Sequence, residues 1–250
     1  MSQVDRQTNR YRYVALLSQW NSRLGMFMTD RLSHPSGDDM RRIRLLRVQN
    51  IIATIWNSTT LSDSEGAFDS YTPQFRTLIS LANKNINNST AAQTTTASNS
   101  SPGSTPILTP NSTPSTEQST SACTSKPPYP FAFETGIIFA LYFTALKCRS
   151  PEIRRQAVSL LSHANPQCEA MWDARILGKI CQRVIETEES GCVFTVTEDP
   201  LTWPMEEQRV HSAFTLPNQE PALNSYQILF IWRPGGPGGA WMNWSETITW

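Results

Sequence analysis

The chain has 250 residues, which is enough for one or two domains with a sizeable hydrophobic core. It carries 21 basic and 21 acidic side chains, so the net charge gives no reason to expect a polyanionic partner. The first residues lack the pattern of a secretory signal, and the longest apolar run, residues 136–146, is shorter than the ~20 residues of a membrane span. We therefore expect neither secretion nor a membrane.

The N-terminal region reads as helical. Apolar residues recur at helical spacing over residues 7–28, and a second helix is predicted over residues 39–57, with Asp38 or Asp39 as its cap. The second helix carries several arginines, which could form a basic patch for nucleic acid. They fan around the helix axis and no aromatic residues alternate with them, so we interpret them as solvated side chains. These residues are Arg41, Arg42, Arg44 and Arg47.

A third N-terminal helix follows a polar loop, residues 58–71. Thr72-Pro73 is a helix start signal, and the apolar stripe that follows predicts a buried face. Serine, threonine, asparagine and proline then dominate residues 88–127, which cannot bury enough apolar surface to offset their chain entropy. We predict a disordered linker there, inserted between helices that still pack together.

Residues 131–189 predict three further helices in antiparallel packing. The first, over residues 134–148, is apolar on nearly every face and is therefore expected to be buried. Ser150-Pro151 and Asn165-Pro166 are start signals for the second and third helices. Three acidic residues near the end of the third helix, Glu186, Glu188 and Glu189, are interpreted as a solvated helix end.

The C-terminal part predicts a sheet. Three runs, residues 208–216, 226–233 and 241–250, have strand character, and a Pro/Gly loop joins the last two. The expected fold is mainly α: an antiparallel helical packing unit with a small C-terminal antiparallel β-meander. Its parts are residues 1–87 (helical), 88–127 (linker), 128–190 (helical core) and 191–250 (a β-rich tail packed on the helices). Three tryptophans of the tail are expected to cover the helices: Trp241, Trp244 and Trp250.

A search for chemistry finds no catalytic, metal-binding or DNA-binding residue. The three histidines, His34, His163 and His211, are not spaced as ligands, and no cysteine pair has the spacing of a zinc site. The five cysteines are expected to be free thiols. The sequence therefore predicts a protein that is not an enzyme and holds no cofactor.

One pattern in the helical core is more specific. Lys147-Cys148-Arg149 precede the serine–proline start, Arg154-Arg155 follow in the helix, and Trp172-Asp173 come before a closing Glu188-Glu189. A second piece, Asp69-Ser-Tyr-Thr-Pro-Gln-Phe75, lies upstream. Together these segments resemble the C-terminal regulatory region of fungal six-cysteine zinc-cluster transcription factors, the fungal-specific transcription factor domain.

The resemblance implies a regulatory, non-DNA-binding domain that acts in the nucleus and controls transcription through protein partners of the transcription machinery or through self-association. Zinc and DNA belong to the family's zinc-cluster module, and this sequence contains no six-cysteine cluster. The motif residues carry over in a structural role, with Asp173 expected to bond to Arg154 or Arg155. The alternative is a stand-alone protein-interaction or small-molecule-responsive domain, with a pocket between the apolar helix of residues 131–146 and the terminal tryptophans.

Overall fold

The computed structural model of the chain describes residues 3–31, 34–96, 131–132, 136–164, 166–192, 195–216 and 225–249. The helices are α1 (Gln3–Arg31), α2 (Gly37–Thr59), α3 (Thr72–Thr96), α4 (Ile138–Lys147), α5 (Pro151–Ser162) and α6 (Ala174–Ser190), with 3-10 turns η1 (Glu65–Tyr71), η2 (Pro200–Thr202) and η3 (Glu206–Gln208). The strands are β1 (Phe131–Ala132), β2 (Cys168–Glu169), β3 (Trp172–Asp173), β4 (Val210–Thr215), β5 (Ser225–Trp232) and β6 (Met242–Thr249). The expected fold class, mainly helical with a small C-terminal antiparallel sheet, is confirmed.

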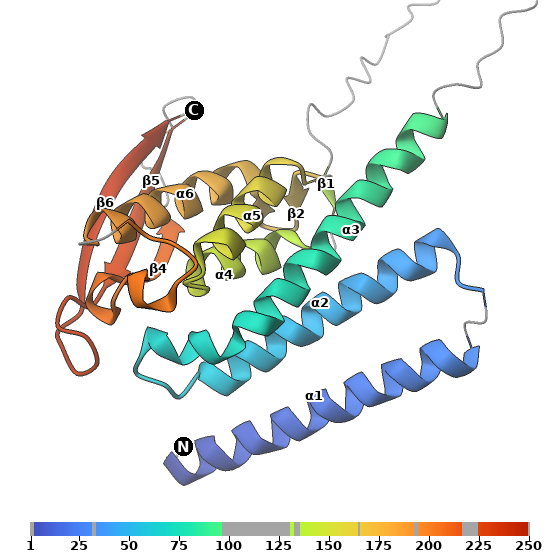
Figure 1. Cartoon of the computed structure of the whole chain (residues 1–250), viewed down its shortest axis with the longest axis horizontal. Coiled ribbons are helices and arrows are strands. Elements are labelled where there is room, and N and C mark those ends of the chain that lie inside the picture. Colours follow the sequence, from blue (N-terminus) through green and yellow to red (C-terminus); the bar gives the residue numbers. More distant parts are fainter. Residues whose placement is uncertain are drawn as a thin grey trace, which may run out of the picture.

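Helix α4 is the centre of the molecule. Helices α2 and α3 lie along one side of it and α5 and α6 along another (Figure 1). Strand β4, the first strand of the C-terminal sheet, also contacts it. Apart from half-exposed positions such as Phe139 and Tyr142, its side chains are buried. This explains why the sequence of α4 is apolar on nearly every face: a helix packed on most sides needs no polar stripe.

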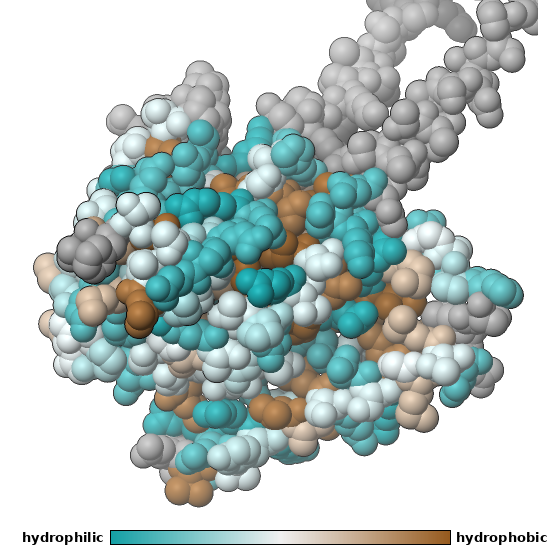
Figure 2. Space-filling view, viewed as in Figure 1, coloured by the Kyte–Doolittle hydropathy of each residue, from teal (hydrophilic) through white to brown (hydrophobic). Residues whose placement is uncertain are grey.

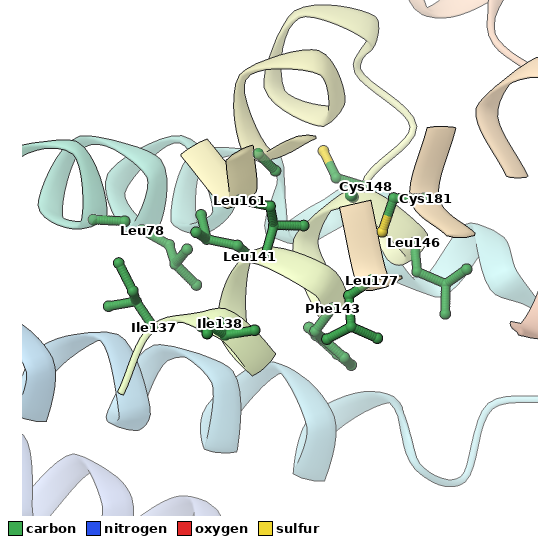
Figure 3. Close-up of a cluster of buried hydrophobic side chains, with 14 of the residues drawn as sticks. Leu78, Ile137, Ile138, Leu141, Phe143, Leu146, Cys148, Leu161, Leu177 and Cys181 are labelled. Carbon is green, nitrogen blue, oxygen red and sulfur yellow. The ribbon is translucent and has the colours of Figure 1, made fainter. Parts of the chain in front are cut away.

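One hydrophobic core runs through the helices and the sheet. Leu78 from α3, Leu141 from α4, Leu161 from α5 and Leu177 from α6 all belong to this cluster and are labelled in Figure 3. The same cluster contains Ile228 and other residues of the meander. The helices before and after the expected linker therefore share a core, as predicted.

The N-terminal helix forms as its periodicity predicts, but much of its apolar surface stays outside. Helix α1 packs mainly against α2, and Tyr13, Leu16 and Phe27 are exposed. Hydrophobic residues accordingly show on the molecule's lower edge in Figure 2, where α1 lies. The cap of α2 differs from the expectation. Ser36 is the N-cap in a capping box: its hydroxyl accepts from the free amide of Asp39, and the carboxylate of Asp39 accepts from the amide of Ser36.

Two segments expected to be irregular are ordered. The polar loop, residues 58–71, contains the 3-10 turn η1, whose Glu65 and Phe68 are buried. The backbone N–H groups at the start of η1, those of Glu65 and Gly66, donate to the carboxylate of Glu206 at 2.7 and 2.8 Å, although Glu206 is far away in the sequence. Helix α3 continues to Thr96, inside the expected linker of residues 88–127, and the remainder of that linker lies outside the described residues.

The start of the last helix was wrongly predicted. Asn165-Pro166 does not begin it; the chain first forms the short strands β2 and β3, with Ala170 at a φ of 51° between them. Helix α6 begins at Ala174, where Asp173 accepts from the amide of Arg175. Proline acts only on its neighbouring residues. The β2 segment that precedes α6 is held by a tertiary contact, because the carboxylate of Glu169 accepts from the amides of Gly136 and Ile138 at the start of α4.

The C-terminal sheet is the predicted meander, in the order β4–β5–β6 with antiparallel pairing. Ile228 and Phe230 are buried against the helical core, and Trp244 stacks on Phe230 with ring centroids 4.8 Å apart. Trp241 does not cover the helices, because 51% of its surface is exposed. Trp250 lies outside the described residues.

Candidate functional site

A pocket of about 550 Å³ opens between the N-terminal helices, α4 and the C-terminal sheet. This volume lies in the range of small-molecule sites. Its lining comes from segments far apart in the chain: the end of α2 with η1, helix α4, strand β3, strand β4 and the loop before β6. The pocket lies beside α4 and Trp241.

Aromatic rings form one wall of the pocket. Trp56 stacks on Phe143 with an interplanar angle of 11°, and Phe139 contacts both Phe143 and Trp172. Tyr142 stacks on Trp172, and its hydroxyl donates to the carbonyl of Ala213 in β4. Because the rings hold one another, the wall is formed before any ligand arrives. Trp56, on α2, has 51% of its surface exposed.

The polar end of the pocket is built around a buried ion pair. Nζ of Lys147 donates to both carboxylate oxygens of Glu65, at 2.8 and 2.9 Å, and to the carbonyl of His211 at 2.7 Å. These bonds use all three donors of the ammonium group. Nδ1 of His211 lies 2.6 Å from the same carboxylate. The pair links η1, α4 and β4, which are separated by more than 60 residues along the chain.

The environment keeps Glu65 ionised. Burial alone would raise the pKa of Glu65, but the hydrogen bond of His211 and the charge and hydrogen bonds of Lys147 outweigh burial and lower it below its ordinary value of 4.5. Burial also lowers the pKa of Lys147, against the opposing attraction of Glu65.

This pKa shift predicts an acid-sensitive contribution to stability. A lowered carboxyl pKa means that the stabilisation by Glu65 is complete above pH 4.5 and is lost as the pH falls through the folded-state value. We expect Glu65→Gln to lower the urea midpoint at pH 7 and the difference from wild type to shrink below pH 4.5. Glu186→Gln, at an exposed ion pair, is the control and is expected to change little at any pH. A Glu65→Gln deficit that stays constant down to pH 3 would contradict the assignment.

The motif residues form a set of ion pairs between distant elements. Arg149 pairs with Asp69, so the two segments that carry the family resemblance contact each other. Arg154 is fully buried, and its Nη2 lies 2.6 Å from Glu188. Arg155 pairs with Glu189 at 2.5 Å. Arg154 and Arg155 therefore join α5 to α6, and Arg149 joins the loop after α4 to the 3-10 turn η1.

The buried arginines also complete the end of α4. Nε of Arg154 donates to the carbonyl of Ala145, and Nη2 of Arg209 donates to the carbonyls of Leu146 and Lys147. These carbonyls lie in the last turn of α4, where positive charge also complements the helix dipole. Glu188 balances both arginines and accepts from the amide of Val210 at 2.8 Å.

Two expectations about these residues are wrong, and two further motif residues, Cys148 and Trp172, are placed by the structure. Asp173 does not bond to Arg154 or Arg155; it pairs with Arg175 and caps α6, because its own backbone lies at the helix start. Glu188 is not solvated: its side chain has no exposed surface. The thiol of Cys148 is buried, and burial raises its pKa to about 11. Trp172 lies in strand β3 and lines the pocket.

Sequence reasoning missed Glu65 and Arg209, and it missed the buried role of Glu188. Glu65 and its partner Lys147 are 82 residues apart in the sequence, and Glu188 is 34 residues from Arg154 and 21 from Arg209. No local sequence pattern therefore marks these residues. One signal could have pointed to them. The Lys147–Arg155 segment carries several cations, and if that segment is buried, each cation needs an acidic partner elsewhere in the chain.

Within the described ranges, no group of three or more histidine, cysteine, aspartate or glutamate residues is arranged to hold a metal ion. No helix among the described residues is long and apolar enough to cross a membrane. The described thiols, Cys148, Cys168, Cys181 and Cys192, are free, and Cys123 falls outside the described part.

Comparison with known proteins adds no relative: no family model, no curated protein and no solved structure matches this chain.

Proposed function

We propose that this chain is a regulatory domain that responds to a small molecule. The observation that supports the proposal is the aromatic pocket, whose wall and polar end come from the N-terminal helices, the central helix and the C-terminal sheet. A ligand there would contact all three parts, and it would favour the arrangement that binds it best. Binding a ligand in this way requires no catalytic nucleophile or base.

The output that we propose is control of transcription in the nucleus, through contacts with other proteins. This part rests on the likeness of Lys147–Arg155, Trp172-Asp173 and the upstream Asp69–Phe75 segment to fungal zinc-cluster regulators. The surface arginines of α2 lie on different sides of the helix: Arg42 and Arg47 are exposed, whereas Arg44 is half-buried. We therefore expect weak and non-selective DNA binding by the chain itself, because clustered cations dominate affinity for phosphate.

The ligand response is tested by filling the pocket. Thr60 is exposed at the pocket's edge, and Thr60→Trp places a large ring there. A thermal-shift screen of small aromatic compounds should find molecules that raise the melting temperature of the wild-type chain and fail to do so for Thr60→Trp. Gln156→Trp, on the exposed face of α5, is the matched control and should keep the response. No stabilising compound, or equal stabilisation of the filled variant, would refute the proposal.

The transcriptional output needs a separate measurement. The chain fused to an unrelated DNA-binding domain is expected to change the expression of a reporter gene in a fungal cell, and Thr60→Trp is expected to alter that change, whereas Gln156→Trp is not. Reporter expression equal to that of the DNA-binding domain alone would refute the transcriptional part and leave the ligand site standing.

A further inference from the structure

We infer that the pocket selects a flat aromatic molecule carrying one carboxylate, with the ring against the aromatic wall and the carboxylate bound by Arg233. The inference rests on the proposed ligand-binding function and specifies its chemical class.

The wall sets the shape of the ligand. Trp56 and Phe143 are nearly parallel, with ring centroids 5.5 Å apart, and Phe139 and Trp172 extend the aromatic surface with centroids 5.0 Å apart. Trp56 exposes half of its surface although it is a large apolar residue, so an apolar face at the pocket is left uncovered. A planar ring covers such a face with more contact than a branched aliphatic group does.

Most charges at the polar end are already balanced. Lys147 and Glu65 neutralise each other, and the three donors of Lys147 are all engaged. His211 is directed to Glu65 by its Nδ1 atom. None of these groups offers an unbalanced charge to a ligand. Asp63 also lines the pocket, and its backbone carbonyl accepts a hydrogen bond from Arg233.

Arg233 is the cation that remains available. Its guanidinium group lies 4.0 Å from the ring centroid of Trp241, and Nη1 donates to the carbonyl of Asp63 at 3.2 Å. Among the described residues no acidic side chain forms an ion pair with it, and its buried Nε atom has no hydrogen-bond partner. The cation–π contact with Trp241 holds the guanidinium group beside a second residue that lines the pocket.

A carboxylate fits this cation better than a neutral or cationic group does. Guanidinium and carboxylate form paired, charge-assisted hydrogen bonds, and Arg233 lines the pocket without an acidic partner among the described residues. An aromatic cage can instead attract a cation, which is the main rival chemistry. The unpaired positive charge of Arg233 opposes such a ligand.

The test uses three probes that share one ring system and differ in charge: 2-naphthoate, 2-naphthamide and 2-naphthylmethylammonium. Titration calorimetry on the full chain is expected to show naphthoate binding at least tenfold more tightly than naphthamide, and the ammonium probe binding least. Arg233→Gln should remove the preference for naphthoate and leave naphthamide binding unchanged. Arg76→Gln, an exposed arginine in a long ion pair on α3, is the control and should keep the preference.

The outcomes separate this inference from the proposed function. Naphthamide binding as well as naphthoate, a preference for the ammonium probe, or a preference that survives Arg233→Gln would each overturn the inference while leaving a ligand pocket in place. Binding of no probe of any charge would overturn both. If Arg233→Gln does not fold, Arg233→Lys keeps the charge without the planar fork and is expected to reduce the preference for naphthoate; an undiminished preference in that variant would also overturn the inference.

Discussion

Replacing Glu188 by alanine is expected to destabilise the protein by about 3–5 kcal/mol, the largest effect that we predict for a single charged residue. Glu188 has no exposed surface and lies between Arg154 at 2.6 Å and Arg209 at 3.3 Å. Its removal leaves two buried guanidinium groups without a counter-charge and the amide of Val210 without its acceptor. Urea unfolding monitored by tryptophan fluorescence measures the loss.

The chain offers a close control for this variant. Glu186 lies two residues earlier on α6, in an exposed pair with Arg183 at 3.6 Å, and Glu186→Ala is expected to stay within about 0.5 kcal/mol of wild type. Replacing all three charges together, Glu188→Leu with Arg154→Met and Arg209→Met, should recover only part of the loss: the desolvation cost of the buried ions is removed, but the carbonyls at the end of α4 lose their arginine donors. A Glu188→Ala variant as stable as the Glu186 control would show that the cluster does not hold the helices.

Gly136→Ala is expected to destabilise the protein by about 2–4 kcal/mol. The backbone amides of Gly136, Ile137 and Ile138 donate to the carboxylate of Glu169, at 2.9, 3.2 and 2.9 Å, which supplies the cap that Ile137 cannot provide from its side chain. A β-carbon on Gly136 would lie 2.2 Å from a carboxylate oxygen of Glu169, so the carboxylate must move away. Hydrogen bonds to a charged group contribute about 1.5–3 kcal/mol each, and more than one would weaken.

Gly178→Ala provides the opposite expectation with the same chemical change. Gly178 lies inside α6, and its added β-carbon would meet the side chain of Leu161 at an ordinary contact distance of 3.8 Å. Alanine is favoured over glycine in a helix interior by about 1 kcal/mol, so this variant should be slightly more stable than wild type. Equal melting temperatures for the two glycine variants would contradict the role of Glu169 at the start of α4.

Local signals in the sequence determined much of the secondary structure. Ser150-Pro151 and Thr72-Pro73 mark the starts of α5 and α3 correctly. The runs with strand character, together with the Pro/Gly loop between the last two, predict all three strands of the C-terminal meander. Caps, proline and side-chain periodicity act over a few residues, so they can be read without knowing the fold. The even apolar character of residues 137–146 likewise predicts the burial of α4.

Tertiary structure alone decided where the charges and the site lie. Glu188 belongs to an acidic run that is ordinary for a solvated helix end, yet Arg154 and Arg209 reach it from other elements and bury it. Helix α6 starts at Ala174, and not after Asn165-Pro166, because the intervening hairpin places Glu169 at the start of α4. The pocket joins residues from Trp56 to Trp241, so no local stretch of sequence contains it. The pairing of groups so far apart depends on how the helices pack, and that packing is set by the whole core at once.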